Sequence, residues 1–387
     1  MKILSVHTSY QLPGGEDQVF ALEAELLRAH GHQVARYTAS NDRLKGQNPL
    51  VMLGNTIWNG SARRAIAERL RREGPDLMHV HNTFPLLSPS IYYAARRSGI
   101  PVVQTLHNYR LLCPAATLFR DGGKCEDCLG RRIPWPGVAH ACYRGSRAAS
   151  SGAAAMLAVH NLIHTWTRTV SVYIALSNFA KEKFIQGGLP AEKIFVKPNF
   201  LASDAGLGSG AGNFALFVGR LTPEKGIEVM LEAWRKLRGS GLPLQIAGDG
   251  PLAGRVEQAS RELPEIVWLK WLPRAEILVK MRQASFLVLP STWYEGFPMI
   301  LAEAFSAGLP VIASDLGSMT SIVGGGGGLL FKPGDPDSLA ERVRSFLADP
   351  AAAQRMRAEA RREFEEKYTG ERNYARIMEI YGAALAG

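Results

Sequence analysis

The sequence predicts an α/β protein made of two doubly wound domains with parallel sheets. Short β-branched runs alternate with segments whose apolar residues recur at helical spacing. This alternation occurs twice, and the small-residue segment LASDAGLGSGAGN at 201–213 separates the two runs. Strands that alternate with helices form parallel sheets covered on both faces, and ligands bind at the carboxyl ends of the strands. We therefore expect the functional site at those ends, in a cleft between the domains.

The expected elements follow the chain in order. The strands of the first run are expected at Ile3–Val6, Gln33–Tyr37, Leu77–Val80, Val102–Leu106 and Val172–Leu176. Those of the second run are expected at Phe214–Val218, Leu244–Ala247, Ile266–Leu269, Phe286–Leu289, Val311–Ala313 and Leu329–Phe331. Gly31 should follow the helix that begins near Glu16, and the chain should be helical from Pro336 onward.

These elements define the expected domains. The first covers 1–200, with an insertion at about 109–150, and the second covers 201–365. A C-terminal helix at 366–387 completes the chain.

Composition indicates a globular protein, because 46% of the 387 residues are hydrophobic and 21% are charged. The opening MKILSVHTSY has too short an apolar run for a signal peptide. The apolar stretch at 148–163 is too short and too polar to span a bilayer. A cytoplasmic location is therefore expected.

The positive charge lies in the first half. Residues 1–200 carry 24 Lys and Arg against 13 Asp and Glu, or +11, whereas the remainder carries 21 against 22, or −1. Solvated arginine-rich helix faces such as SARRAIAERLRREG are one explanation. An anionic partner is the other, and an anionic membrane surface would attract such a half by about 1 kcal/mol per close basic residue. No nucleic-acid-binding signature is present, so nucleic acid is not expected as a partner.

Two carboxylates stand in an otherwise apolar run, STWYEGFPMILAEAFSAGLPVIAS at 291–314. Pro298 suits the first position of a helix, and Gly308 suits the position just after its end. Glu295 is then expected in the loop before this helix, and Glu303 on its second turn. The helix N-terminus attracts anions, so two flanking acids fit a ligand with hydroxyls on both sides of a phosphate.

A nucleoside diphosphate sugar is such a ligand. Gly296 would let the backbone approach it closely. The alternative is structural, with Glu303 in a buried ion pair and Glu295 solvated.

A second stretch, FVGRLTPEKGIEVMLEAW, places Arg220 and Lys225 after the first strand of the second domain. Two cations there could hold a diphosphate and stabilise its charge as it leaves. The alternative is a solvated turn with surface cations.

Glycine turns follow other strands. AGDGP, with Gly248 and Gly250, ends a strand but does not match the dinucleotide pattern, and no P-loop pattern is present. Gly14 and Gly15 lie between the first strand and its helix, where they could approach a phosphate or simply start the helix.

Taken together, GRLTPEKG, AGDGP and EGFPMILAEAFSAGLPVIAS resemble the retaining glycosyltransferases of family 4, which have the two-domain GT-B fold. The resemblance extends over essentially the whole chain, and the family's E-x7-E signature corresponds to Glu295 and Glu303. It also implies that the C-terminal helix at 366–387 crosses back and packs on the first domain.

The resemblance implies a role for each matched residue. Glu303 would bind the ribose hydroxyls, Glu295 would contact the donor sugar, and His107 in TLHN would lie near that sugar. Taken alone, a lone strand-end histidine such as His107 is more often structural. Arg220 and Lys225 would hold the diphosphate. Backbone groups would approach sugar and phosphate at Gly15, Gly296, Phe297 and Met299.

The resemblance also implies a reaction with retention in which the leaving phosphate accepts the acceptor's proton, since no nucleophile is evident. Cations at the diphosphate would act where charge develops, so no catalytic metal is expected. The DPD segment at 335–337 is expected to cap a helix through Asp335 or Asp337. UDP, GDP and ADP donors are not distinguished, and base contacts are expected around Trp271 and Leu272.

Four cysteines lie within thirty residues, at Cys113, Cys125, Cys128 and Cys142. One C-x2-C pair with two flanking cysteines could form a structural zinc site that fixes the insertion, although the flanking spacings are irregular. For His79 and His81 in HVHN, packing is expected rather than metal ligation.

Three functions are consistent with these features. The first is a glycosyltransferase acting on a glycan or polyprenyl-diphosphate-linked acceptor, with peripheral contact to an anionic membrane at its inner face. The second is a sugar-nucleotide epimerase of the same fold, which needs no acceptor. The third is a non-catalytic sensor, which the intact set of candidate site residues disfavours.

Overall fold

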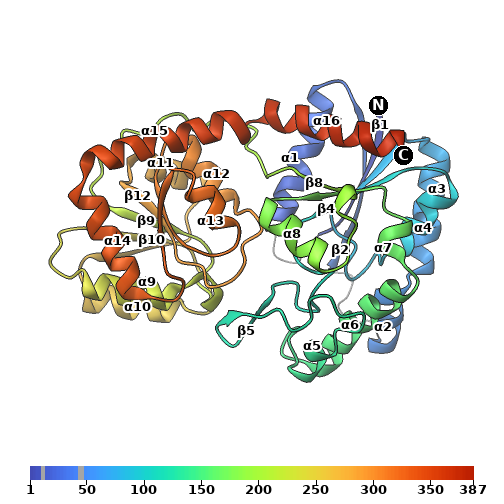
Figure 1. Ribbon diagram of the computed structural model, residues 1–387, viewed down its shortest axis with the longest axis horizontal. Helices are drawn as coiled ribbons and strands as arrows, with labels where there is room; N and C mark the ends of the chain where they lie inside the picture. Colours follow the sequence, from blue (N-terminus) through green and yellow to red (C-terminus); the bar gives the residue numbers. More distant parts are fainter. Residues whose placement is uncertain (10–13, 42–47) are drawn as a thin grey trace. The chain divides into compact units, whose positions relative to one another are not determined.

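The computed structural model describes residues 1–9, 14–41 and 48–387, which form two compact units (Figure 1). Unit 1 contains Met1–Leu118, Cys125–Pro198 and Glu371–Gly387, and unit 2 contains Phe119–Lys124 and Asn199–Gly370. Each unit is an α/β domain with a six-stranded parallel sheet, as the alternation predicts.

Unit 1 has the strand order β2-β1-β3-β4-β7-β8, so the order reverses beside β1 as in a doubly wound sheet. Its strands are β1 (Lys2–Ser9), β2 (Gln33–Ser40), β3 (Leu77–Val80), β4 (Val102–Leu106), β7 (Val172–Ala175) and β8 (Ile194–Val196). Its helices are α1 (Gly15–Ala29), α2 (Pro49–Ile57), α3 (Gly60–Glu73), α4 (Ser90–Arg97), α5 (Trp135–Ala139), α6 (Arg147–Leu162), α7 (Thr165–Arg168), α8 (Asn178–Gln186) and α16 (Gly370–Ala386).

The C-terminal helix α16 is part of the core of unit 1. Ile377 and Ile380 are fully buried and join Leu27 of α1 and Val103 of β4 in one apolar cluster. Figure 1 shows this helix in red beside the blue first strand. The last helix of the chain therefore packs on the sheet that contains the first strand.

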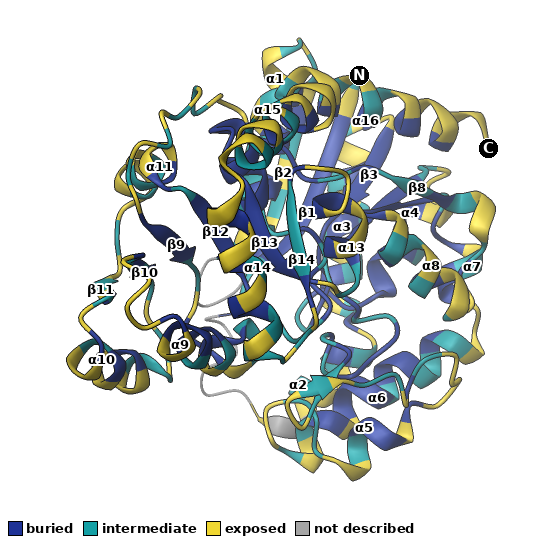
Figure 2. Cartoon of the chain, turned by 60° about the vertical axis from the view of Figure 1, so that its left-hand side comes forward, coloured by how far each residue is buried: buried dark blue, intermediate teal, exposed yellow. Residues whose placement is uncertain are grey.

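Unit 2 has the strand order β11-β10-β9-β12-β13-β14. Its strands are β9 (Ala215–Val218), β10 (Leu244–Ala247), β11 (Ile266–Lys270), β12 (Phe286–Leu289), β13 (Val311–Ser314) and β14 (Gly328–Phe331). Its helices are α9 (Ile227–Lys236), α10 (Ala253–Glu262), α11 (Arg274–Gln283), α12 (Met299–Ser306), α13 (Ser318–Val323), α14 (Pro336–Ala348) and α15 (Pro350–Lys367). Figure 2 shows the central strands such as β13 as buried, the edge strand β14 as intermediate and the outer helix faces as exposed.

Most expected elements are confirmed, with boundaries that match at β3, β4, β10 and β12. Gly31 follows the C-cap of α1 with a φ of 83°. Asp335 caps α14 by accepting hydrogen bonds from the N–H groups of Asp337 and Ser338. The helix after Glu295 begins at Met299, one residue later than expected, because Pro298 is its extended N-cap.

Three strands were not expected. One is β8, an edge strand of three residues. The other two, β5 (Phe119–Arg120) and β6 (Gly123–Lys124), form a two-residue antiparallel hairpin within the insertion. All three are too short to show a period of two in the sequence.

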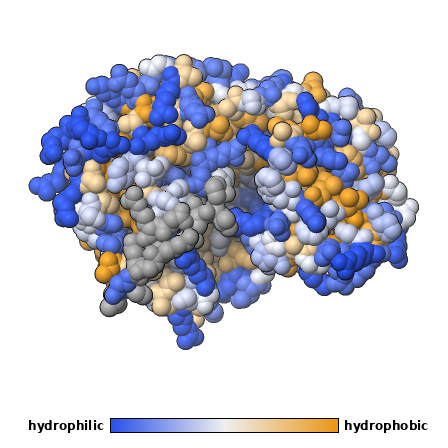
Figure 3. Space-filling model, turned by 180° about the vertical axis from the view of Figure 1, so that it is seen from behind, coloured by the Kyte–Doolittle hydropathy of each residue, from blue (hydrophilic) through white to orange (hydrophobic). Residues whose placement is uncertain are grey.

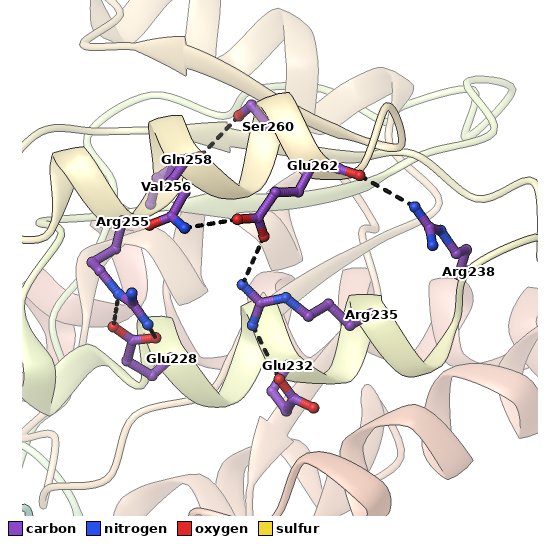
Figure 4. A network of polar contacts seen from close by, with 9 residues as sticks. All are labelled: Glu228, Glu232, Arg235, Arg238, Arg255, Val256, Gln258, Ser260 and Glu262. Carbon is purple, nitrogen blue, oxygen red and sulfur yellow. Dashed lines mark hydrogen bonds and ion pairs between the residues drawn. The ribbon is translucent and has the colours of Figure 1, made fainter.

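Charged side chains on the helices form local surface networks. In Figure 4, Arg255 of α10 pairs with Glu228 of α9, and Arg235 contacts both Glu232 and Glu262. Each exposed pair of this kind contributes about 0–1 kcal/mol. These charges connect neighbouring helices rather than forming a binding site.

The arginine-rich helix α3 is amphipathic, with Ala62, Ile66 and Leu70 buried and Arg71 and Arg72 exposed. Its charge is therefore that of a solvated face. On the side of the molecule in Figure 3, hydrophilic and hydrophobic residues are interspersed. Among the described helices, none is both long and apolar enough to cross a bilayer.

Candidate active site

Lys225 and Glu295 form a direct ion pair in unit 2, with Nζ and Oε1 2.6 Å apart. Lys225 ends a short 3-10 turn after β9, and Glu295 lies in the loop after β12. Gly226 makes this approach possible, because its φ is 71° and a Cβ there would lie 1.8 Å from the Pro290 carbonyl oxygen. The two strand-end loops thus meet at one edge of the sheet.

Glu295 is buried, yet it is ionised. Burial acts to raise its pKa, but the charge and hydrogen bond of Lys225 outweigh this effect and keep the pKa below its usual value. Ser291 also donates a hydrogen bond of 2.7 Å to the same oxygen, Oε1. The alternative in which Glu295 is solvated is therefore wrong, because the residue is 7% exposed and its carboxylate accepts hydrogen bonds from Lys225 and Ser291.

Arg220 is exposed and lines a pocket of about 290 Å³ at the carboxyl ends of β9 and β10. Trp271 and Leu272 line the same pocket, and Trp271 is 70% exposed. Gly248 also borders it, and a Cβ there would lie 1.9 Å from the Gly219 carbonyl oxygen. The pocket offers a cation and an aromatic face, both of which suit a nucleotide.

Glu303 forms an ion pair whose partner the sequence pattern did not identify. Its Oε1 lies 3.0 Å from Nε of Arg274 at the start of α11. Burial raises the pKa of Glu303, and Arg274 only partly opposes this. The structural alternative for Glu303 is thus present in the structure, although the arginine is 43% exposed and can move aside for a ligand.

The start of α12 lies between the two acids. Gly296 is partly exposed and Phe297 is buried, while the Phe297 carbonyl accepts a hydrogen bond of 2.9 Å from Asn199. Met299 is the first helical residue, so its N–H points out of the N-terminus. These groups lie at the start of α12, and their role as a backbone site for an anion stays a prediction.

The remaining candidates lie in unit 1. His107 follows β4, and its Nε2 is 2.9 Å from Nδ1 of His81. Burial lowers the pKa of both histidines, that of His81 to about 3, so both are neutral at pH 7. They line a small pocket of about 30 Å³ together with Asn108 and Arg110.

Gly15 is the exposed first residue of α1. Asn108 donates a hydrogen bond of 3.3 Å to Glu16, so the starts of α1 and of the loop after β4 are adjacent. Residues 10–13 of the same glycine turn lie outside the described residues.

Unit 1 contains a buried polar network that sequence reasoning missed. Glu23 of α1 pairs with Lys197 at 2.8 Å, and its other oxygen lies 3.1 Å from His79 and 3.4 Å from His81. Tyr381 of α16 lies 2.8 Å from His79 Nδ1. Glu23 and Lys197 are 174 residues apart in sequence, so no local pattern marks the pair.

The ligand atoms of Glu23, His79 and His81 lie within 4.8 Å of one another, as metal ligands would. Lys197 already neutralises the carboxylate, and Thr105 lies 2.8 Å from His79 Nε2. His79 and His81 are buried beside this carboxylate, in agreement with the expectation that they pack.

Two family models match consecutive parts of the chain. Glycosyltransferase Family 4 matches residues 13–204, and Glycosyl transferases group 1 matches residues 204–363. The chain carries two glycosyltransferase domains. This confirms the resemblance at the level of the domains.

Two sequence relatives of these glycosyltransferase domains match different lengths of this chain. The glycogen synthase of Mycobacterium tuberculosis (strain ATCC 25618 / H37Rv) is 35% identical over 44% of this chain, which spans only 43% of the synthase. The phosphatidyl-myo-inositol mannosyltransferase of Mycobacterium leprae is 28% identical over 96% of this chain and 94% of the relative.

Solved structures share the architecture over the whole chain. Anabaena Alr3699/HepE in complex with UDP has a TM-score of 0.71 at 19% identity and covers 99% of this chain and 100% of its own. Sucrose-phosphate synthase from Thermosynechococcus elongatus has a TM-score of 0.71 at 17% identity, with full coverage of both chains. These likenesses establish the GT-B fold.

Proposed function

We propose that this protein transfers a hexose, with retention, from a nucleoside diphosphate sugar to an acceptor. The observation that carries the proposal is the Lys225–Glu295 pair at the edge of the sheet where Arg220 borders a pocket. It combines two cations for a diphosphate with an ionised carboxylate for sugar hydroxyls. The solved structures of Anabaena Alr3699/HepE with UDP and with UDP-glucose support a nucleotide sugar as donor.

In the proposed reaction, the bond between the anomeric carbon and the diphosphate oxygen breaks as positive charge develops on the sugar. The acceptor oxygen forms the new bond on the same face, and its proton passes to the departing diphosphate. Lys225 and Arg220 stabilise the negative charge on that leaving group, so the protein itself supplies the cations. Glu295 orients the sugar, and Glu303 binds the ribose after Arg274 moves aside.

A lipid-linked or surface-polysaccharide precursor is the proposed acceptor, reached at the inner face of the membrane. One full-length relative is a phosphatidyl-myo-inositol mannosyltransferase, which supports a lipid acceptor. In unit 1, Ile133 and Trp135 are 56% and 57% exposed, and Arg131 lies over the Trp135 ring. Exposed aromatic and basic residues of this kind favour peripheral contact with an anionic membrane.

The test measures release of nucleoside diphosphate from UDP-, GDP- and ADP-linked hexoses, with and without membrane lipid extract. A transferase releases diphosphate in proportion to glycosylated lipid or glycan, and the product retains the donor's anomeric configuration. Release of diphosphate together with a free epimerised sugar, without any acceptor, would instead establish the epimerase. Donor binding without any turnover would favour the sensor, and absence of binding for every donor would overturn the proposal.

Glu303→Gln is expected to weaken donor binding about 10- to 100-fold, because a charge-assisted hydrogen bond contributes about 1.5–3 kcal/mol. Since burial raises the pKa of Glu303, donor affinity should also fall as pH drops through that raised value. Calorimetric titration with the donor's nucleoside diphosphate, from pH 5 to 8, measures both effects. Glu276→Gln changes an exposed acid in the first turn of α11 and is the matched control. Equal affinities for the two variants would remove the ribose role.

A further inference from the structure

The insertion at about 109–150 has little regular structure to hold it. Between Cys113 and Ser146 the structure contains only the β5–β6 hairpin and the five-residue helix α5. Five of the eight non-glycine residues with positive φ in the described chain fall in this stretch, at Ala116, Leu118, Asp121, Ala141 and Arg144. Such backbone persists only where the surroundings fix it, and the short elements do not.

Contacts around Gly137 and its short helix bring together Cys142, Cys128 and the neighbour of Cys113. The Gly137 carbonyl accepts a hydrogen bond of 3.0 Å from the N–H of Cys142. A Cβ on Gly137 would lie 2.8 Å from Pro114, the neighbour of Cys113, so only glycine fits without displacing that ring. Cys125 follows the hairpin, and its N–H donates a hydrogen bond of 2.8 Å to the carbonyl oxygen of Leu118, which precedes the hairpin.

The Sγ atom of Cys128 lies 3.8 Å from the carbonyl oxygen of Pro134, the residue that precedes the short helix containing Gly137. All four cysteines are free of disulfides, and Cys113 and Cys128 are buried.

The C-x2-C segment has a fixed turn. Glu126 accepts a hydrogen bond from Leu129 N–H through its carbonyl, and Cys128 accepts one from Arg131 N–H. Lys183 of α8 anchors the same turn through an ion pair of 2.8 Å with Glu126. Two cysteines at this spacing on a fixed turn are half of a structural zinc site, and two more supply the other half.

We propose that Cys113, Cys125, Cys128 and Cys142 bind one structural Zn²⁺ that holds the insertion together. The side chains would turn so that the sulfur atoms stand about 3.8 Å apart around the ion, as four ligands at about 2.3 Å require. Each thiol that binds loses its proton to solvent, and the two positive charges of the ion offset half of the thiolate charge, so the closed site stays anionic. A closed four-sulfur site leaves no position for substrate, so the metal is structural and takes no part in sugar transfer.

The site would also fix part of the pocket that His107 lines. Arg110 donates a hydrogen bond to the Pro114 carbonyl, and its guanidinium lies 4.1 Å from the Phe84 ring and 4.8 Å from the Tyr143 ring. Pro114 follows Cys113, and Tyr143 follows Cys142. Release of the metal would therefore free both supports of a side chain that lines this pocket.

The test is metal analysis of the full chain purified without chelator from zinc-supplemented medium. We expect about one equivalent of zinc per chain, and less than about half an equivalent for Cys125→Ser and Cys128→Ser. His140→Ala changes an exposed potential ligand in the same insertion and should keep the full equivalent. Thiol reagents should modify the native wild-type protein only as zinc is released.

Cobalt substitution of the wild-type chain tests the site independently of whether the variants fold. Tetrahedral thiolate ligation predicts strong visible d–d absorption and thiolate-to-metal charge-transfer bands. Less than about half an equivalent of zinc in the wild type, disulfides between these cysteines in alkylated protein, or zinc that survives Cys128→Ser would each overturn the proposal. None of these outcomes bears on donor binding in unit 2, so the glycosyltransferase proposal is tested separately.

Discussion

Lys225→Ala is expected to lower kcat by about 100- to 1,000-fold, the size of effect seen when one group that stabilises developing charge is removed. The ammonium group ends a rigid turn that Gly226 fixes against Pro290, so it is held in place before the donor arrives. Because its charge acts on the departing diphosphate, the loss should fall on kcat more than on KM.

The variant also leaves Glu295 buried without its cation. Burial is then opposed only by the hydrogen bonds of Ser291 and Trp293, so the pKa of Glu295 should rise. In the wild type the depressed pKa adds stability above the unfolded pKa, and this is lost as pH falls. The variant loses this contribution, so the stability gap between the two should widen from about pH 4 to pH 7.

Steady-state kinetics with the donor that the test of UDP-, GDP- and ADP-linked hexoses selects measure the first consequence. Thermal unfolding across that pH range measures the second. Lys236→Ala is the matched control, since it removes an exposed lysine of the next helix that pairs with Asp337 at 2.9 Å. A kcat within about threefold of the wild type for Lys225→Ala would assign the residue a purely structural role.

Sequence patterns predicted the sheets well because parallel strands buried on both faces are continuous apolar runs. Phe286–Leu289 is such a run, Leu77–Val80 is one except for His79, and the structure confirms both boundaries. The short strand Ile194–Val196 has only three residues on an edge, so nothing in its composition separates it from the preceding turn.

The sequence predicted after which strands the candidate site residues lie, but it did not predict which of their side chains form ion pairs. Strand ends and helix caps are local features, and they place Arg220, Lys225 and Glu295 correctly after β9 and β12. Which side chains pair depends on how loops meet across the sheet. The Arg274–Glu303 pair was therefore missed, and Glu295 was considered as a solvated residue although Lys225 holds it buried.

The Glu23–Lys197 pair carries the largest expected effect on stability. Glu23→Ala should lower the free energy of unfolding by about 3–5 kcal/mol, because it leaves a lysine that is 1% exposed without a counter-charge. His79, which lies 2.8 Å from Tyr381 of α16, would lose its carboxylate partner as well, which should loosen α16 from the sheet. Urea unfolding at pH 7 measures the change, and Glu25→Ala, an exposed acid two residues away on α1, should change it by less than about 0.5 kcal/mol.

The pH dependence and a double variant separate charge from packing. Glu23 has a lowered pKa, so its contribution is present above its unfolded value and is lost as pH falls through the folded one. His81 acts in the same direction, since burial lowers its pKa to about 3 and protonation below its unfolded value favours the unfolded chain. The gap in the free energy of unfolding between wild type and Glu23→Ala should therefore shrink in acid.

Replacing both partners, with Glu23→Met and Lys197→Met, should recover most of the lost stability, because an apolar pair avoids the desolvation cost of two buried charges. If the double variant were as unstable as Glu23→Ala alone, the stabilisation would come from the shape of these side chains and their hydrogen bonds, and not from their charges.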